Sequence, residues 1–207
     1  MKKDITCFCG ANFPIEYEEE IYIDENPGLL DEIFAGTFMS INCLSCGKKH
    51  KPEFEIKIFW KSRNLAMDVI PELERGEYYR NKKNKSLKDN IQTIIGFPEM
   101  ADRLAVIKDG LDPAVIETLK SFLLIKAGEN YPEKEINAWY SGSSQSGIEF
   151  HLDGIREGEV AVMRIPQETY SKTLKDYKKH PKKEIYTSLR SGSYLSVQNH
   201  LRPDLLK

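Results

Sequence analysis

TCFCG at residues 6–10 and NCLSCG at residues 42–47 contain all four cysteines of this 207-residue chain. A glycine follows each pair and lets the backbone turn its N–H groups toward sulfur without a Cβ clash. A tight turn that presents two cysteines supplies two of the four ligands of a tetrahedral zinc ion. We therefore expect one Zn²⁺ to bind this set of residues and to hold the N-terminal part of the fold together: Cys7, Cys9, Cys43 and Cys46.

The two pairs differ in their spacing. Two residues separate Cys43 from Cys46, which is typical of a zinc-binding turn, whereas only Phe8 separates Cys7 from Cys9. The turn of the first pair must therefore differ from that of the second. The 33 residues from Gly10 to Asn42 are enough for a strand, a helix and a second strand that returns to the metal.

Other uses of the cysteines are less favoured. The N-terminus MKKDITCFCG has no apolar core and is not a secretory signal, and reduced thiols are the rule in the cytosol, so disulfides are not expected. Unrelated buried thiols would not explain why both pairs precede glycine. Iron–sulfur binding by four cysteines stays a rival within the metal-binding class.

The predicted metal site is structural rather than catalytic. Four thiolates close the coordination shell, whereas catalytic zinc keeps one position open for water. His50 lies four residues after Cys46 and could replace one ligand. The favoured alternative puts His50 on the following turn, either solvated or donating to a group around the site.

The N-terminal half is predicted to be rich in β-strands. Residues 26–28 begin a short helix that ends at Gly36, and residues 62–64 form a hairpin turn. Residues 72–90 are rich in lysine and asparagine and are predicted to be an exposed connector. Alternating apolar and polar residues predict strands over 4–24, 38–42, 54–60 and 65–70.

The chain from Gly96 to Gly128 is predicted to form two helices joined at Gly110 and Leu111. Pro98 begins the first one; Asp112 caps the second, which Gly128 ends. Beyond them, a helix starts at Pro166, and strands are predicted at 136–140, 148–152, 160–165 and around Tyr194. The fold class is α+β: a zinc ribbon-like β-rich N-terminal part, an αα-hairpin, and a small antiparallel sheet with one helix. We predict a zinc-binding domain over 1–127 and an α+β extension over 131–207, either separate or packed with it.

Composition and charge favour a globular cytoplasmic protein. Charged residues make up 30% of the chain and hydrophobic residues 40%, and no apolar run approaches the roughly 18–20 residues of a membrane helix. The formal net charge is −2, and four thiolates with one Zn²⁺ would bring it to about −4. General binding of polyanions and membrane association are therefore not expected.

Two other kinds of chemistry are conceivable. His151 and Glu149, with Asp153 next to them, share the polar face of a predicted strand, so they could form an acid–base pair or an ordinary solvated surface. We favour the solvated surface. Aromatic residues near lysines offer material for stacking on single-stranded nucleic acid. These aromatic residues are Phe59, Trp60, Tyr78, Tyr79 and Trp139, although the apolar strand context places Phe59 or Trp60 in a core. The basic clusters are Lys82–Lys88 and Lys172–Lys183.

The sequence resembles the CpXC family, a bacterial and archaeal group without an assigned biochemical function. The resemblance is carried by ITCFCG with Phe13, by NPGLLDEIFAGTF and by NCLSCGKKH, and IIGFPEMADRL and GLDPAVIETLK extend it, so that it runs from Ile5 to Lys126. It implies a zinc ribbon-like site at the four cysteines and nothing about a reaction or a partner. The family's motif has two residues between its first cysteines, where this chain has one.

Three functions follow in order of preference. The first is a zinc-stabilised binding or adaptor module that recognises another protein. The second is a zinc ribbon that binds nucleic acid, and the third is an enzyme with its site in the C-terminal half.

Overall fold

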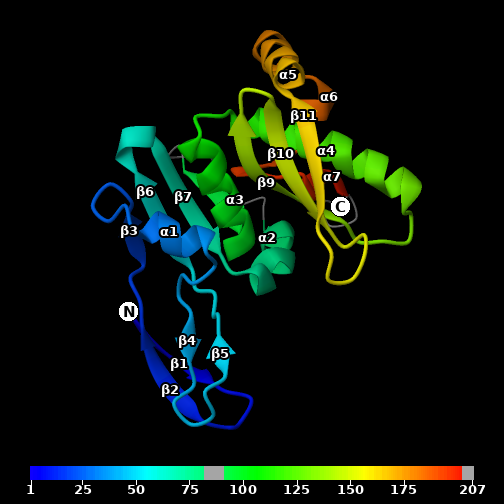
Figure 1. The fold of residues 1–207 in the computed structure, drawn as a ribbon. Helices are drawn as coiled ribbons and strands as arrows, with labels where there is room; N and C mark the ends of the chain where they lie inside the picture. Colours follow the sequence, from blue (N-terminus) through cyan, green and yellow to red (C-terminus); the bar gives the residue numbers. More distant parts are fainter. Residues whose placement is uncertain (82–90, 202–207) are drawn as a thin grey trace. The chain divides into compact units, whose positions relative to one another are not determined.

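A computed structural model describes residues 1–81 and 91–201 of the chain. The fold is mixed α+β with small antiparallel sheets, as predicted (Figure 1). The described residues form two compact units, one of residues 1–78 and 91–101 and the other of residues 79–81 and 102–201. The boundaries of these units do not coincide with residues 127–131, where we predicted a boundary between two domains. Whether the chain has two separate domains stays a prediction.

Two small hairpins carry the cysteines in the first unit. β1 (Lys2–Thr6) pairs antiparallel with β2 (Asn12–Glu16), and β4 (Ile41–Asn42) pairs antiparallel with β5 (Lys49–His50). The hairpins lie together at one end of the unit (Figure 1). The strand predicted over 38–42 is confined to residues 41–42 because Met39 has a φ of 51° and breaks the extended backbone.

Four strands of the first unit follow the order β8-β7-β6-β3. β6 and β7 are antiparallel and joined by the short 3₁₀ turn Lys61–Arg63, while β3 is parallel to β6 and β8 is parallel to β7. The helix α1 buries Leu30 and Ile33. The bounds are β3 (Glu20–Tyr22), α1 (Leu29–Phe34), β6 (Ile56–Trp60), β7 (Leu65–Ile70) and β8 (Gln92–Ile95).

Part of the predicted connector over 72–90 is helical, which corrects the prediction. The 3₁₀ helix Glu72–Glu74 leads into α2 (Arg75–Asn81). Tyr78 and Tyr79 are buried, and aromatic burial of this kind stabilises a short helix despite its polar neighbours. The rest of the predicted connector, with Lys82, Lys83, Lys85 and Lys88, lies outside the described residues.

The predicted αα-hairpin is present as α3 (Phe97–Lys108) and α4 (Pro113–Asn130). The Asp112 side chain accepts hydrogen bonds from the backbone N–H groups of Ala114 and Val115, which caps α4 as predicted. Gly128 does not end α4, because its backbone stays helical and the helix continues to Asn130. No helix in the described residues is both long and apolar enough to cross a membrane.

The second unit contains an antiparallel sheet in the order β11-β10-β9. Its apolar core joins α4, the sheet and α5, with Leu119, Ile148 and Phe150 fully buried. The polar residues 141–147, between the strands predicted over 136–140 and 148–152, were predicted to form a loop. They are mostly strand, because Ser143 and Ser144 continue the pairing with β10. The bounds are β9 (Asn137–Ser144), β10 (Gly147–Asp153), β11 (Ala161–Pro166) and α5 (Gln167–Lys179). The chain continues with α6 (Glu184–Thr187), β12 (Arg190–Ser191), β13 (Tyr194–Leu195) and α7 (Gln198–Leu201).

Candidate metal centre

The loop that closes each small hairpin is held by two backbone hydrogen bonds. In the first loop, Cys7 N donates to Ala11 O (2.8 Å) and Gly10 N donates to Cys7 O (2.9 Å). In the second loop, Cys43 N donates to Lys48 O (2.9 Å) and Gly47 N donates to Cys43 O (2.8 Å).

Both glycines have positive φ, 88° for Gly10 and 71° for Gly47, which a residue with a side chain rarely adopts. In both loops the glycine N–H bonds to the carbonyl of the first cysteine, despite the difference in spacing. The short Cys7–Cys9 spacing is thus accommodated by a tighter turn of the same design.

The loops bring the four predicted ligands together. The sulfur atoms of Cys7, Cys9, Cys43 and Cys46 all lie within 4.8 Å of one another. Across the hairpins, the Sγ atoms of Cys7 and Cys46 are 3.6 Å apart, and those of Cys9 and Cys43 are 3.8 Å apart. A tetrahedron with zinc–sulfur bonds of about 2.3 Å has edges of about 3.8 Å. The four cysteines can therefore hold a metal ion, and their geometry fits zinc.

The four side chains differ in exposure. Cys7 and Cys43 are buried, whereas Cys9 and Cys46 are exposed. Each of the two short sulfur–sulfur contacts thus joins a buried cysteine of one hairpin to an exposed cysteine of the other. Four sulfur ligands would leave no coordination position for water, as in structural zinc sites.

His50 lies next to this cluster rather than completing it. It is the last residue of β5, opposite Ile41, and its Nε2 lies 3.1 Å from Cys7 Sγ. Its ring stacks against Phe8 at a centroid distance of 6.1 Å and meets the edge of Phe13 at 6.0 Å. With Nε2 protonated, His50 donates an N–H···S hydrogen bond to Cys7. The favoured prediction placed His50 on a turn, solvated or donating to a group around the site. It lies instead in β5, because the pairing with β4 extends to this residue, and it contacts one of the four cysteines directly.

The pKa values of the Cys7 and Cys43 thiols are shifted in opposite directions. The backbone N–H bond from Cys9 lowers the pKa of Cys7, but burial and thiol hydrogen bonds from Cys9, Cys46 and Cys43 outweigh it and raise the pKa to about 12. Burial raises the pKa of Cys43, but backbone N–H bonds from Cys46 and Ser45 and thiol bonds lower it to about 6. In the absence of a cation, Cys43 therefore ionises more readily than Cys7, and metal binding requires both thiols to lose their protons.

The tips of the same loops expose two large apolar side chains. Phe8 is 86% exposed and Leu44 is 94% exposed. The ammonium group of Lys48 lies 4.4 Å from the centroid of the Phe8 ring. We call Phe8, Leu44 and Lys48 the loop-tip surface. Neither residues 5–13 nor residues 41–50 contain an acidic residue.

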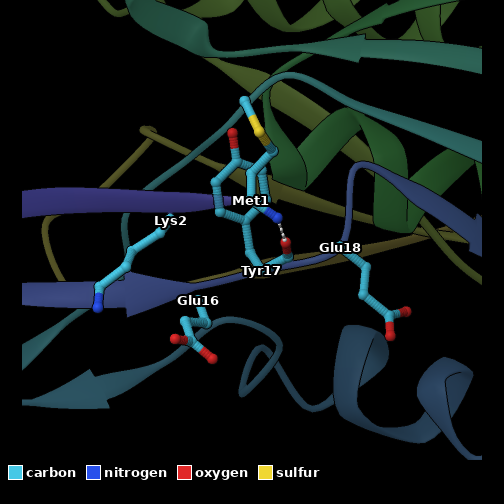
Figure 2. A pocket seen from close by; sticks show the side chains of 5 residues that line it. All are labelled: Met1, Lys2, Glu16, Tyr17 and Glu18. Carbon is cyan, nitrogen blue, oxygen red and sulfur yellow. Dashed lines mark hydrogen bonds between the residues drawn. The ribbon is translucent and has the colours of Figure 1, made fainter.

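A shallow pocket lies at the other end of the β1–β2 hairpin. Figure 2 shows its lining by Met1, Lys2, Glu16, Tyr17 and Glu18, and its volume is about 590 Å³. The N-terminal ammonium group donates to Tyr17 O (2.6 Å), and Lys2 lies opposite Glu16 in the strand register. The pocket contains none of the predicted site residues, and its polar contacts close the hairpin.

The predicted acid–base pair is part of a polar cluster on the sheet surface. Ser141 Oγ lies 2.9 Å and Glu149 Oε1 lies 3.8 Å from the same atom, His151 Nε2. Arg164 donates to Glu149 (2.8 Å), and this bond lowers the pKa of that carboxyl group. In a nucleophilic triad the carboxylate and the hydroxyl contact opposite ring nitrogens of the histidine. Here both groups face Nε2, so the three residues do not form such a triad, and the solvated surface stays the favoured prediction.

Three of the five aromatic residues suggested for stacking on nucleic acid are not accessible. Trp60, Tyr78 and Tyr79 are buried, so their rings cannot stack on bases. The Trp139 indole donates to Asp153 Oδ2 (2.7 Å). In the basic segment Lys172–Lys183, Lys172 pairs with Glu168 and Lys183 pairs with Asp176.

Comparison with known proteins agrees with these observations. The sequence model of the family described as "CpXC protein" matches residues 5–120. The chain is also similar to an uncharacterized protein of Treponema pallidum (strain Nichols), with 28% identity over 94% of this chain and 96% of that protein. No solved structure matches it.

Proposed function

The chain belongs to the CpXC family, and from the geometry of its four cysteines we propose that it is a binding protein stabilised by structural zinc. The ligands would be Cys7, Cys9, Cys43 and Cys46, with His50 as a hydrogen-bond donor to Cys7. A bound zinc ion supplies a cross-link between the two hairpins. The observation that carries the proposal is the sulfur–sulfur spacing of 3.6 and 3.8 Å across the hairpins.

The secondary structure of the hairpins explains why such a cross-link is needed. β4 and β5 contain two residues each, which is too short for an independently stable hairpin. The sulfur cluster is the point where this hairpin meets the loop of β1 and β2. We propose that the paired hairpins form a zinc ribbon-like element, as the family resemblance implies.

The loop-tip surface supports a binding role. Large apolar side chains that are almost fully exposed gain roughly 1.5–3 kcal/mol each when a partner buries them. Phe8 and Leu44 are adjacent to metal ligands, so the metal would fix their positions relative to each other. We propose that the partner is a cytoplasmic protein with an apolar pocket for these side chains.

The metal assignment is tested by zinc content and thermal stability. The protein purified with zinc should contain one equivalent per chain, and Cys43→Ser should lose it and melt at a lower temperature. Ser45→Ala, in the same loop, is the matched control and should keep both properties. A Cys43→Ser variant with a full zinc equivalent and an unchanged melting temperature would falsify the assignment.

The binding role is tested with a Phe8→Ser/Leu44→Ser variant that retains zinc. Leu73→Ser is the control, because Leu73 is 98% exposed in the same unit and belongs to the 3₁₀ helix Glu72–Glu74 rather than to a cysteine hairpin. A specific partner should be retained from cell extract by the wild type and the control and be lost from the double variant. Identical sets of retained proteins for all three would count against the loop-tip surface.

A further inference from the structure

The short sulfur–sulfur contacts carry an inference that rests on the proposed zinc site. We propose that this site is redox-sensitive: a hydroperoxide expels the metal and joins Cys7 to Cys46 and Cys9 to Cys43. Two disulfides between the hairpins then take the place of the zinc cross-link.

The pairing follows from the contacts between the loops. The Cys7–Cys46 and Cys9–Cys43 contacts are 3.6 and 3.8 Å long, and each joins one hairpin to the other. Two other pairings exist. One joins Cys7 to Cys9 and Cys43 to Cys46 within the loops; the other joins Cys7 to Cys43 and Cys9 to Cys46, which also crosses the hairpins but pairs the two buried sulfurs with each other and the two exposed sulfurs with each other. The glycine N–H bonds to Cys7 O and Cys43 O hold both loops in their closed turns. A bond across the hairpins needs only the approach of sulfur atoms that already touch.

Exposure assigns a role to each member of a pair. Cys9 and Cys46 are accessible to a peroxide in solution, whereas Cys7 and Cys43 are buried behind them. Each cross-hairpin pair therefore has one exposed sulfur that reacts first and one buried sulfur that resolves the product. A bond within either loop would also join an exposed to a buried cysteine, so exposure determines the order of reaction and the contacts determine the partner.

The chemistry is balanced with hydrogen peroxide as the oxidant. The exposed thiolate attacks one peroxide oxygen, the O–O bond breaks, and a sulfenic acid and a hydroxide form. The buried thiolate then attacks the sulfenic sulfur, forms the S–S bond and displaces a second hydroxide. Solvent protonates both hydroxides to water. Two peroxides thus oxidise four thiolates to two disulfides and are reduced to four waters, while the zinc ion leaves without changing its oxidation state.

The change would reach the proposed binding surface. A disulfide places its sulfur atoms about 2.05 Å apart, well below the present 3.6 and 3.8 Å contacts. Phe8 lies between two of the reacting cysteines and Leu44 follows a third. Oxidation would therefore alter the loop-tip surface, and reduction with zinc would restore it.

The test begins with the full-length, reduced, zinc-loaded protein. Its zinc content is measured first, so that absence of zinc at this stage identifies a failure of the proposed function. Hydrogen peroxide should then release one zinc equivalent to a chromogenic chelator, and the intact mass should fall to that of the apo-protein less four hydrogen atoms. Reduction followed by added zinc should restore the bound metal.

Disulfide mapping decides the pairing. Cleavage after glutamate separates residues 1–16 from residues 33–53, so bonds across the hairpins leave these peptides linked and bonds within a loop leave them separate. Fragmentation of the linked peptides should assign Cys7–Cys46 and Cys9–Cys43. Separate peptides, a different cross-pairing, or retained zinc with unmodified thiols would each overturn the proposal.

A single variant gives a second measurement of the pairing. Cys9→Ser should form only the Cys7–Cys46 bond on oxidation and should leave Cys43 free. Formation of Cys43–Cys46 in this variant would contradict the preference for bonds across the hairpins. If the variant does not fold, the disulfide map of the wild-type protein decides the pairing without it.

Discussion

At the scale of single residues, His50 is the neighbour with the most direct influence on the sulfur cluster. Its Nε2 lies 3.1 Å from Cys7 Sγ, and two aromatic rings hold the imidazole in place. A hydrogen bond to a ligand sulfur stabilises the thiolate form that a metal requires.

We expect His50→Ala to keep one zinc equivalent per chain but to weaken zinc affinity. Loss of a hydrogen-bond partner of a metal ligand typically reduces affinity by about 10–100-fold. Competition with a chelator of known affinity measures the change. Lys49→Ala, at the preceding exposed position of β5, is the control and should bind zinc as the wild type does.

The two possible failures of this prediction have different meanings. Unchanged affinity would show that the His50–Cys7 contact does not stabilise the thiolate. Complete loss of zinc from a folded variant would indicate that His50 itself is a ligand in place of one of the cysteines.

The sequence was enough to predict that the four cysteines form one site, but not which residues contact their sulfur atoms. Four cysteines in two glycine-closed pairs predicted one site, and the structure brings all four sulfur atoms together. The identity of the sulfur that His50 contacts could not be predicted. It depends on the register in which β5 pairs with β4 and on how the two hairpins approach each other, and neither is encoded in a local pattern.

At the scale of elements, a buried ionic cluster joins α3 to α4. Lys120 Nζ on α4 lies 2.5 Å from Asp102 Oδ2 on α3 and 2.9 Å from Glu117 Oε1 on its own helix. The Nη2 atom of Arg103 lies 3.6 Å from Glu117 Oε1. Asp102 also accepts the backbone N–H of Tyr140, and Glu117 accepts that of Val197, so the cluster orients segments from β9 and beyond β13.

The charges of this cluster depend on one another. Burial raises the pKa of Glu117, but the charges of Lys120 and Arg103 outweigh it and lower the pKa below its ordinary value. Burial raises the pKa of Asp102, and the attraction of Lys120 only partly offsets this. Removal of the Lys120 ammonium would leave two buried carboxylates with a single cation nearby in the cluster.

Lys120→Met should therefore destabilise the protein by about 3–5 kcal/mol, the range for breaking one side of a buried ion pair. Urea denaturation measures the free energy of unfolding. Lys126→Met is the matched control, because Lys126 is exposed on the same helix, and its effect should stay within about 0.5 kcal/mol. An equally small effect at Lys120 would mean that the cluster contributes no net stability.

Local patterns predicted most elements and failed where distant contacts decide the structure. The strand Leu65–Ile70 was predicted to the residue because alternation, a turn before it and Pro71 after it all agree. The helix α2 was missed because Tyr78 and Tyr79 stabilise it by burial, while its composition resembles a loop. Glu117 and Lys120 were not predicted as core residues, because an apolar pattern gives no signal for charges that are buried as partners.

At the scale of the whole molecule, the cysteine hairpins depend on a different kind of interaction from the apolar cores. The first unit buries apolar side chains of β6 and β7, among them Ile58, Met67 and Val69. The second unit has its own apolar core between α4, the β11-β10-β9 sheet and α5. The hairpins of the first unit have short strands and the sulfur cluster. Removal of the metal should therefore affect the hairpins first.

We expect a chelator to accelerate amide hydrogen exchange at residues 1–17 and 38–50 by at least about tenfold, because loss of the cross-link lowers the free energy of local opening. Exchange at the backbone of α4 and β10 should stay as slow as in the zinc-loaded protein. Mass spectrometry of peptic fragments measures both regions in one sample. Added zinc should restore the original rates, and equal acceleration throughout the described residues would show that the metal governs the entire fold.

The position of the hairpins along the chain has a consequence for biosynthesis. Both loops and their closing glycines lie within residues 7–47, and β5 ends at His50. A ribosome produces the N-terminal part of a domain first. The nascent chain therefore possesses every proposed metal ligand while most of the remaining elements are still to be translated. Zinc supply at that moment, rather than after release, would determine whether the thiols are occupied before they meet an oxidant.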